Sequence, residues 1–117
     1  NNTCCITGIS IPSLLQACHI KSWTDSDPIT ERTNPVNGLS LNKLHHAAFD
    51  EGILTIDTDY RILISKTAKD KYSNEAFNEN FLKYEGKQIT LPERFLPSKE
   101  ILQNLLQPPN ICLLLFS

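Results

Sequence analysis

Residues 44–50 read Leu-His-His-Ala-Ala-Phe-Asp, and with Ala-Cys-His-Ile at 17–20 and Asn-Gly-Leu at 37–39 they decide how this chain is expected to fold. All three histidines of the 117-residue sequence lie within these blocks. Histidine has an unperturbed pKa of roughly 6.5, so near neutral pH it can act as a base or as a neutral metal ligand. The clustering of the histidines around one intervening segment therefore predicts a chemical site.

The block at 44–50 lies in a segment with helical spacing. Leucine, alanine and phenylalanine recur along 41–50 at the period of an α-helix, and Gly52 follows as a residue that can end it. His46 and Asp50 are four residues apart, so they project side by side from this helix, away from its apolar stripe. A neutral imidazole and a carboxylate in that arrangement can bind one divalent ion.

The block at 17–20 precedes a long loop. Pro12 at an early helical position predicts a helix from 11 to 21, with His19 near its end. Prolines and mixed charges predict a loop of about 14 residues at 22–36, and Asn37-Gly38 favours a tight turn with positive backbone angles. If the segment before the loop crosses the helix, His19 faces a water beside the ion and can deprotonate it. The pattern favours metal-assisted hydrolysis of a phosphodiester, in which Asn37 holds the loop and orients the His19 ring.

The remaining segments predict short elements. Alternating β-branched runs at 53–57 and 60–65 predict a β-hairpin. We expect one short amphipathic helix within the polar segment 66–83, and a short strand at 88–92 that a proline stops. Ser98 as an N-cap and helical spacing predict a helix at 98–106.

The composition limits what the chain can be. With 40% hydrophobic and 21% charged residues, 117 residues suit one modest core, so we expect a single domain over 1–117. The net charge of −2 counts against a large surface that follows phosphates, but not against a small site where a cation supplies positive charge. The start at Asn1, without an initiating Met, suggests a fragment of a longer protein. The apolar tail 111–116 fits a last strand, a face for a missing segment or a cloning artefact.

The four cysteines point to a reducing compartment. Cys4, Cys5, Cys18 and Cys112 show no C-x-x-C spacing, and adjacent cysteines are poorly placed to bridge each other. No apolar run is long enough to span a bilayer, and no signal peptide opens the chain. We therefore expect a cytoplasmic protein with reduced thiols and no membrane partner.

Four blocks in order resemble the HNH endonucleases, most closely the bacterial branch found as the nuclease domain of restriction-type enzymes. They are residues 4–8 (CCITG), 17–23 (ACHIKSW), 37–42 (NGLSLN) and 44–52 (LHHAAFDEG). The resemblance covers a core motif at 4–65 and extends more loosely over 84–106. It implies an α+β fold built on a ββα-metal (His-Me) finger, in which two strands and a helix clasp one divalent cation. A β-hairpin and C-terminal helices would be added to it. It also implies that DNA is the substrate and that the protein acts in a restriction or defence system.

The resemblance also implies roles for single residues. His19 corresponds to the general base, Asn37 to the middle Asn, and His46 to a metal ligand on the helix. Asp50 falls where a second helix ligand sits. Members of this branch place the final His at the position of His45 or of His46, and the pairing with Asp50 favours His46 for the metal. His45 is then a candidate for a catalytic phosphate contact or for packing.

Cys18 departs from the family pattern, in which an acid or another His often precedes the base. As a third metal ligand, a Cys18 thiolate would suit zinc better than magnesium. An uncoordinated Cys18 would leave more water on the ion, which magnesium tolerates. Mg²⁺ is the first expectation, and Mn²⁺, Ni²⁺ and Zn²⁺ stay open.

Two other interpretations remain. The chain could be a catalytically degenerate HNH-fold module that binds nucleic acid or protein without hydrolysis. It could also be a zinc-stabilised structural module held by Cys18, His46 and Asp50. For a nuclease, specificity for a DNA sequence would come from a homodimer or from a missing DNA-recognition domain, because nothing here looks like a recognition helix.

Overall fold

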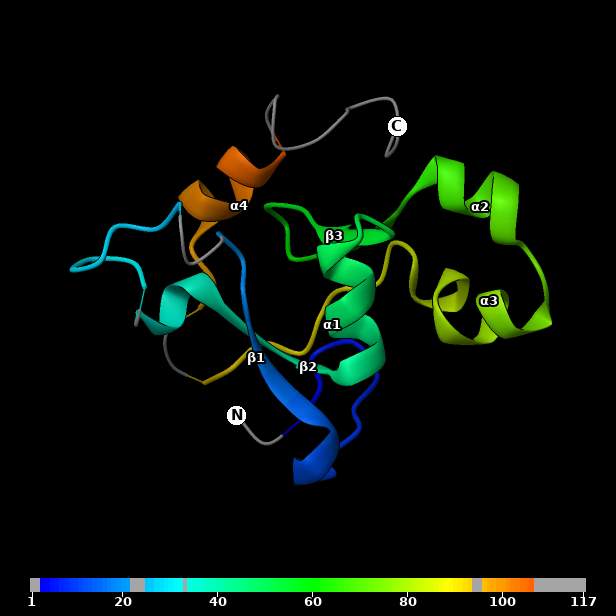
Figure 1. Ribbon diagram of the computed structural model, residues 1–117, viewed down its shortest axis with the longest axis horizontal. Coiled ribbons are helices and arrows are strands. Elements are labelled where there is room, and N and C mark those ends of the chain that lie inside the picture. The colour runs from blue at the N-terminus through cyan, green and yellow to red at the C-terminus, as the bar shows by residue number, and fades with distance from the viewer. Residues whose placement is uncertain (1–2, 22–24, 33, 94–95, 107–117) are drawn as a thin grey trace.

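A computed structural model describes residues 3–21, 25–32, 34–93 and 96–106 (Figure 1). The chain combines short strands with short helices. In chain order these are 3₁₀ turn η1 (Pro12–Leu14), β1 (Leu15–His19), 3₁₀ turn η2 (Pro35–Asn37), β2 (Gly38–Asn42), α1 (Lys43–Asp50), β3 (Leu54–Ile56), β4 (Ile62–Ile64), α2 (Lys66–Tyr72), α3 (Glu75–Asn80), 3₁₀ turn η3 (Leu82–Tyr84) and α4 (Lys99–Leu105). A mixed helix-and-strand fold was expected, and the structure has one.

Two strands and the helix that follows them form the centre of the molecule (Figure 1). β1 and β2 pair antiparallel, with Cys18 opposite Leu39 and His19 opposite Gly38. α1 starts directly after β2 and contacts β1, β2 and β3. The side chain of Asn42 caps the helix by accepting a hydrogen bond from the backbone N–H of His45.

The segment at 11–21 corrects the predicted helix. Pro12 opens only the 3₁₀ turn η1, and residues 15–19 are a strand. The apolar pattern of this segment suits either structure, and pairing with the distant β2 decides between them. The helix predicted at 41–50 exists but begins at Lys43, because Leu41 and Asn42 still pair in β2.

The turn predicted at Asn37-Gly38 is also wrong in detail. Asn37 ends η2, Gly38 begins β2, and neither residue has a positive φ. The Asn37 backbone N–H donates to the Asn34 carbonyl at 3.0 Å, so the chain reverses through a right-handed 3₁₀ turn. Gly52, which follows α1, does have a positive φ of 75°, as expected for a residue that ends a helix.

The predicted hairpin at 53–65 is confirmed. β3 pairs antiparallel with β4, Leu54 opposite Ile64 and Ile56 opposite Ile62. Asp57 closes the turn, where its side chain accepts hydrogen bonds from the backbone N–H groups of Asp59 and Arg61 at 2.9 Å. The strand predicted at 88–92 is reduced to a single bridge between Gln88 and Arg61.

The later helices differ in number from the prediction. The segment 66–83 holds two helices, α2 and α3, because Ser65 and Asn74 each cap a separate helix with their side chains. The helix predicted at 98–106 is confirmed as α4, with the Ser98 hydroxyl accepting from the Ile101 N–H at 3.2 Å. The apolar tail 111–116 lies outside the described residues.

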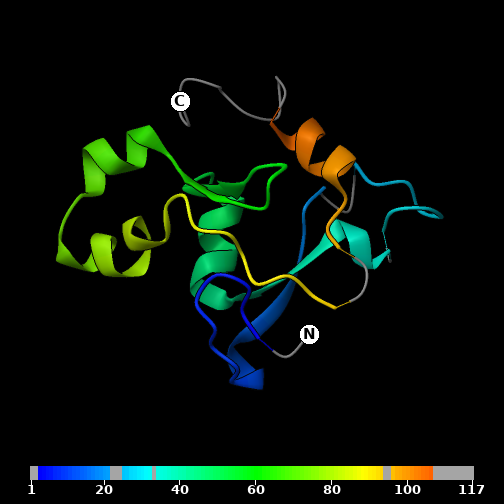
Figure 2. The same cartoon turned by 180° about the vertical axis from the view of Figure 1, so that it is seen from behind.

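One cluster of buried apolar side chains connects these elements. It includes Leu41 of β2, Ala48 of α1, Ile56 of β3 and Leu102 of α4. The segment after η3 crosses the back of the molecule (Figure 2), and the Thr90 N–H there donates to the Cys5 carbonyl at 2.8 Å. Across the described ranges, no helix combines the length and the apolar character that a membrane crossing requires.

Candidate metal centre and catalytic histidine

Three side chains predicted as metal ligands lie together where α1 crosses β1. One ligand atom each from Cys18, His46 and Asp50 lies within 4.8 Å of the other two. His46 Nε2 is 3.3 Å from Asp50 Oδ2, as their spacing along one helix face requires. Cys18 joins them from β1, so the group depends on the packing of the helix against the strand.

His46 is held by a residue that the sequence analysis missed. Its Nδ1 lies 2.6 Å from the side-chain oxygen of Gln16 on β1. An amide oxygen only accepts hydrogen bonds, so Nδ1 carries the proton that is donated. In the neutral ring the lone pair is then on Nε2, the nitrogen that faces Asp50. Alternation along a strand would have placed Gln16 beside Cys18, but this segment was predicted to be helical.

The Cys18 thiol is almost completely buried, with 1% of the residue exposed. Burial, helped by the nearby Asp50 carboxylate and by Cys5, raises the pKa of the Cys18 thiol to about 12. The thiol is therefore protonated near neutral pH unless a cation replaces the proton. A bound divalent ion lowers the pKa of a coordinating thiol enough to deprotonate it.

The donors in this group fit one divalent cation. An imidazole nitrogen, a sulfur and a carboxylate oxygen are all ligands that Zn²⁺ accepts. An ion about 2.0–2.3 Å from each ligand keeps any two of them within roughly 4.6 Å of one another. The observed limit of 4.8 Å thus requires only a small adjustment of side chains. With fewer protein ligands and more water, Mg²⁺ also fits here.

His19, the predicted base, is the last residue of β1 and directly follows Cys18. Its Nε2 lies 2.8 Å from the backbone carbonyl oxygen of Arg32 in the long loop. Because a carbonyl oxygen only accepts, Nε2 is the protonated nitrogen and Nδ1 carries the lone pair of the neutral ring. His19 therefore has the tautomer that a base acting through Nδ1 needs.

Asn37 is completely buried and ties the two ends of the long loop together. Its side-chain oxygen accepts from the Lys21 backbone N–H at 2.7 Å. Its amide donates to the Lys21 carbonyl, the Ser26 hydroxyl and the Glu31 carbonyl at 3.1–3.3 Å. Asn37 thus lies where it can hold the loop, and the His19 ring is oriented by the Arg32 carbonyl of that same loop.

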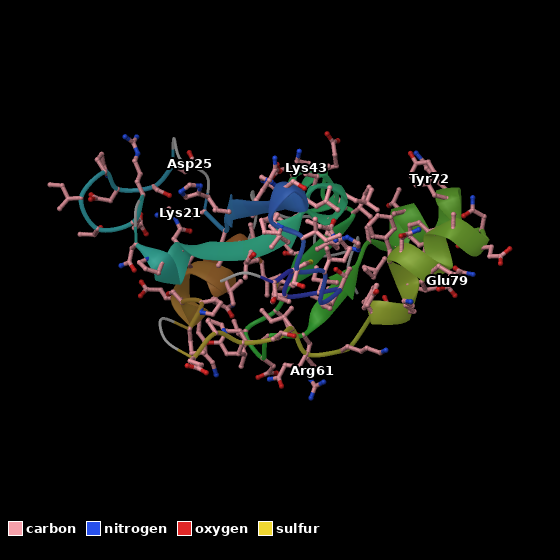
Figure 3. All side chains as sticks on the ribbon, turned by 90° about the horizontal axis from the view of Figure 1, so that it is seen from below. Lys21, Asp25, Lys43, Arg61, Tyr72 and Glu79 are labelled. Atoms are coloured by element: carbon pink, nitrogen blue, oxygen red, sulfur yellow. The ribbon has the colours of Figure 1, made fainter. Side chains whose placement is uncertain are left out.

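Ion pairing adds to the rigidity of this loop. Lys21 Nζ lies 2.8 Å from Glu31 Oε1, and the Asp27 N–H donates to the same carboxylate. The pairing with Lys21 is the main cause that lowers the pKa of Glu31. Figure 3 shows Lys21 and Asp25 at this end of the molecule, far from Tyr72 and Glu79 on α2 and α3.

His45, a candidate for a catalytic phosphate contact or for packing, lies apart from the metal-ligand group. Only 2% of it is exposed, and its ring lies between α1 and the segment around Phe81 and Tyr84. Its Nε2 is 2.6 Å from the Asn80 carbonyl and its Nδ1 is 3.0 Å from Asn42 Oδ1. Burial lowers the pKa of His45, although the Asn80 carbonyl opposes this effect. Of the two roles considered, a phosphate contact or packing, packing is the one that this burial fits.

The N-terminal part of the chain matches a known family model. Residues 4–57, a little under half of the chain, match the family model described as HNH endonuclease. This range includes both strands of the first hairpin, α1 and all six residues that were predicted to form the site. No curated protein matches the chain.

Proposed function

Because residues 4–57 match the family model described as HNH endonuclease, we propose that this chain is a metal-dependent endonuclease that hydrolyses phosphodiester bonds of DNA. In this proposal β1, β2 and α1 form the ββα-metal finger. The observation that carries it is the group of Cys18, His46 and Asp50, whose ligand atoms lie within 4.8 Å of one another.

The two histidines have different proposed roles: His46 binds the cation, and His19 is the general base. A divalent cation held by His46, Asp50 and Cys18 would stabilise negative charge on the phosphate and on the leaving oxygen. His19 accepts a proton from the attacking water at Nδ1, and its Nε2–H bond to the Arg32 carbonyl keeps the ring in that tautomer. The same bond stabilises the imidazolium that results.

The identity of the cation depends on Cys18. If the thiol stays protonated, His46 and Asp50 with several waters suit Mg²⁺, the first expectation from the sequence. If the thiol gives up its proton, the mixed nitrogen, sulfur and oxygen ligands suit Zn²⁺ better. Comparing Mg²⁺, Mn²⁺, Ni²⁺ and Zn²⁺ in one assay therefore also reports whether Cys18 coordinates.

Nicking of supercoiled plasmid tests the proposal. Wild type should nick DNA only with a divalent ion, and both His19→Ala and His46→Ala should lose the activity. Gln103→Ala, at an exposed position on α4, serves as the matched control and should cleave like wild type. Each variant is first checked for folding by circular dichroism. A folded wild type that cleaves with none of the four ions would contradict the proposal.

A catalytically degenerate binding module is the second candidate, and the cysteine at position 18 favours it. In that case Cys18→Asp should bring a large gain of cleavage over wild type. A zinc-stabilised structural module makes another prediction, since removing its ion by chelator dialysis should unfold the domain. A nuclease cation should leave the fold in place when it is removed.

We also propose that the nuclease acts within a restriction or defence system. With a net charge of −2, this chain is a poor candidate for sequence recognition, so a homodimer or a separate DNA-recognition domain would supply it. Light scattering of the chain with and without DNA would measure its molar mass, and a mass of two chains would support the homodimer.

A further inference from the structure

Gln16 lies on the same face of β1 as Cys18. Side chains two residues apart on a strand point the same way, and in the register of this sheet Gln16 is opposite Leu41 and Cys18 opposite Leu39. Both side chains reach partners on α1: Cys18 belongs to the metal-ligand group, and the Gln16 oxygen is 2.6 Å from His46 Nδ1.

This contact decides which nitrogen of His46 can bind a metal. A neutral imidazole has one N–H and one lone pair, and the Gln16 oxygen requires the N–H at Nδ1. Nε2 then presents its lone pair to Asp50 Oδ2, 3.3 Å away. Two electron-rich atoms at that distance repel each other unless a proton or a cation lies between them.

We propose that Gln16 is a positioning residue of the metal centre, whose side-chain oxygen keeps His46 protonated at Nδ1 and directs Nε2 to the cation. The inference rests on the proposed function, because it assumes that the group binds a metal ion. Hydrogen bonds from such outer residues typically change metal affinity by 10–100-fold. Gln16 is exposed to solvent, so an effect of roughly tenfold is expected.

Calorimetric titration of the whole chain with Co²⁺ measures this effect. Gln16→Leu removes the acceptor and should raise the Kd by roughly tenfold. Gln16→Glu keeps an acceptor oxygen and should bind at least as tightly as wild type. The matched control is Gln103→Leu, another exposed glutamine, which should bind like wild type. An unchanged Kd in Gln16→Leu would overturn the inference.

The ¹⁵N spectrum of the His46 ring gives a second readout that a purely structural role would not move. Wild type should show the Nδ1–H tautomer, and Gln16→Leu should shift the ring toward Nε2–H. A wild-type ring protonated mainly at Nε2 would also overturn the inference. If His46→Ala binds Co²⁺ as well as wild type does, the metal centre itself is wrong and the proposed function fails with it. An unchanged Kd confined to Gln16→Leu would remove only the role of Gln16.

Discussion

His19 and His46 have opposite tautomers because different oxygens hold them. The Arg32 backbone carbonyl fixes the proton of His19 on Nε2, and the Gln16 side chain fixes that of His46 on Nδ1. In the proposed function, one ring would accept a proton at Nδ1 and the other would bind a cation at Nε2. Two residue positions with the same side chain thus acquire different chemistry from their neighbours.

Asn37 should contribute to stability more than to chemistry. Asn37→Ala leaves a partly buried backbone N–H and partly buried carbonyls without their partner, so we expect the free energy of unfolding to fall by about 2–4 kcal/mol. Urea denaturation measures this loss, with Asn78→Ala at an exposed position of α3 as the control. A loss below about 1 kcal/mol would mean that the loop is held in another way.

His45 should make the protein less stable in mild acid. Because its pKa is lowered in the folded state, the unfolded chain takes up the proton first as the pH falls. The full stability is therefore present above about pH 6.5 and declines below it, by at most about 1.4 kcal/mol per pH unit from this group. His45→Phe should reduce the slope, as measured by urea unfolding at pH 7.5 and pH 5. An equal slope in both proteins would assign the acid sensitivity to other groups.

At the scale of elements, local patterns predicted some structures well. The helix over 43–50, the hairpin at 53–65 and α4 follow from spacing and capping residues that are neighbours in sequence. The strand β1 did not follow, because its structure depends on pairing with β2 about 20 residues away. The same error concealed Gln16, since its place beside Cys18 exists only in a strand.

The candidate site, like the fold, was predicted only in part from the sequence. His19, Asn37, His46 and Asp50 were predicted as site residues from residue type, spacing and family resemblance. The structure brings Cys18 close to His46 and Asp50, as expected. The Arg32 carbonyl could not be found, because a backbone oxygen leaves no signal in the sequence. The burial of His45 could not be predicted, because two adjacent histidines look equivalent until the fold shows which face of α1 is covered.

Asn42 should stabilise the junction between β2 and α1. Its oxygen caps the helix, and its amide donates to the Thr7 hydroxyl at 3.2 Å, which links the N-terminal loop to the junction. Asn42→Ala should lower the free energy of unfolding by about 1–2 kcal/mol through the lost cap alone, and by more through the buried amide contact. Asn42→Ser retains a capping oxygen and should lose less. Equal losses for the two variants, measured in urea, would show that the cap contributes little.

At the scale of the whole molecule, α1 separates two different environments. One side of the helix carries His46 and Asp50 toward β1, and another packs His45 against the segment after α3. β1, β2, β3 and the end of α3 thus all contact an eight-residue helix. An ion bound by the first side ties α1 to β1, so its free energy of binding adds to the stability of the entire fold.

Metal binding should therefore raise the melting temperature, and more so at higher pH. An ion at 100 times its Kd stabilises the folded state by about 2.7 kcal/mol, which for a domain of this size corresponds to roughly 10 °C. If Cys18 coordinates, its thiol with a pKa of about 12 must release a proton, so affinity and the shift in melting temperature increase from pH 6.5 to pH 8. Calorimetric melting with Zn²⁺ at both pH values measures the effect, and His46→Ala should abolish it. Cys18→Ser should weaken the pH dependence while His46 and Asp50 still bind, and an unchanged dependence in that variant would exclude the thiol as a ligand.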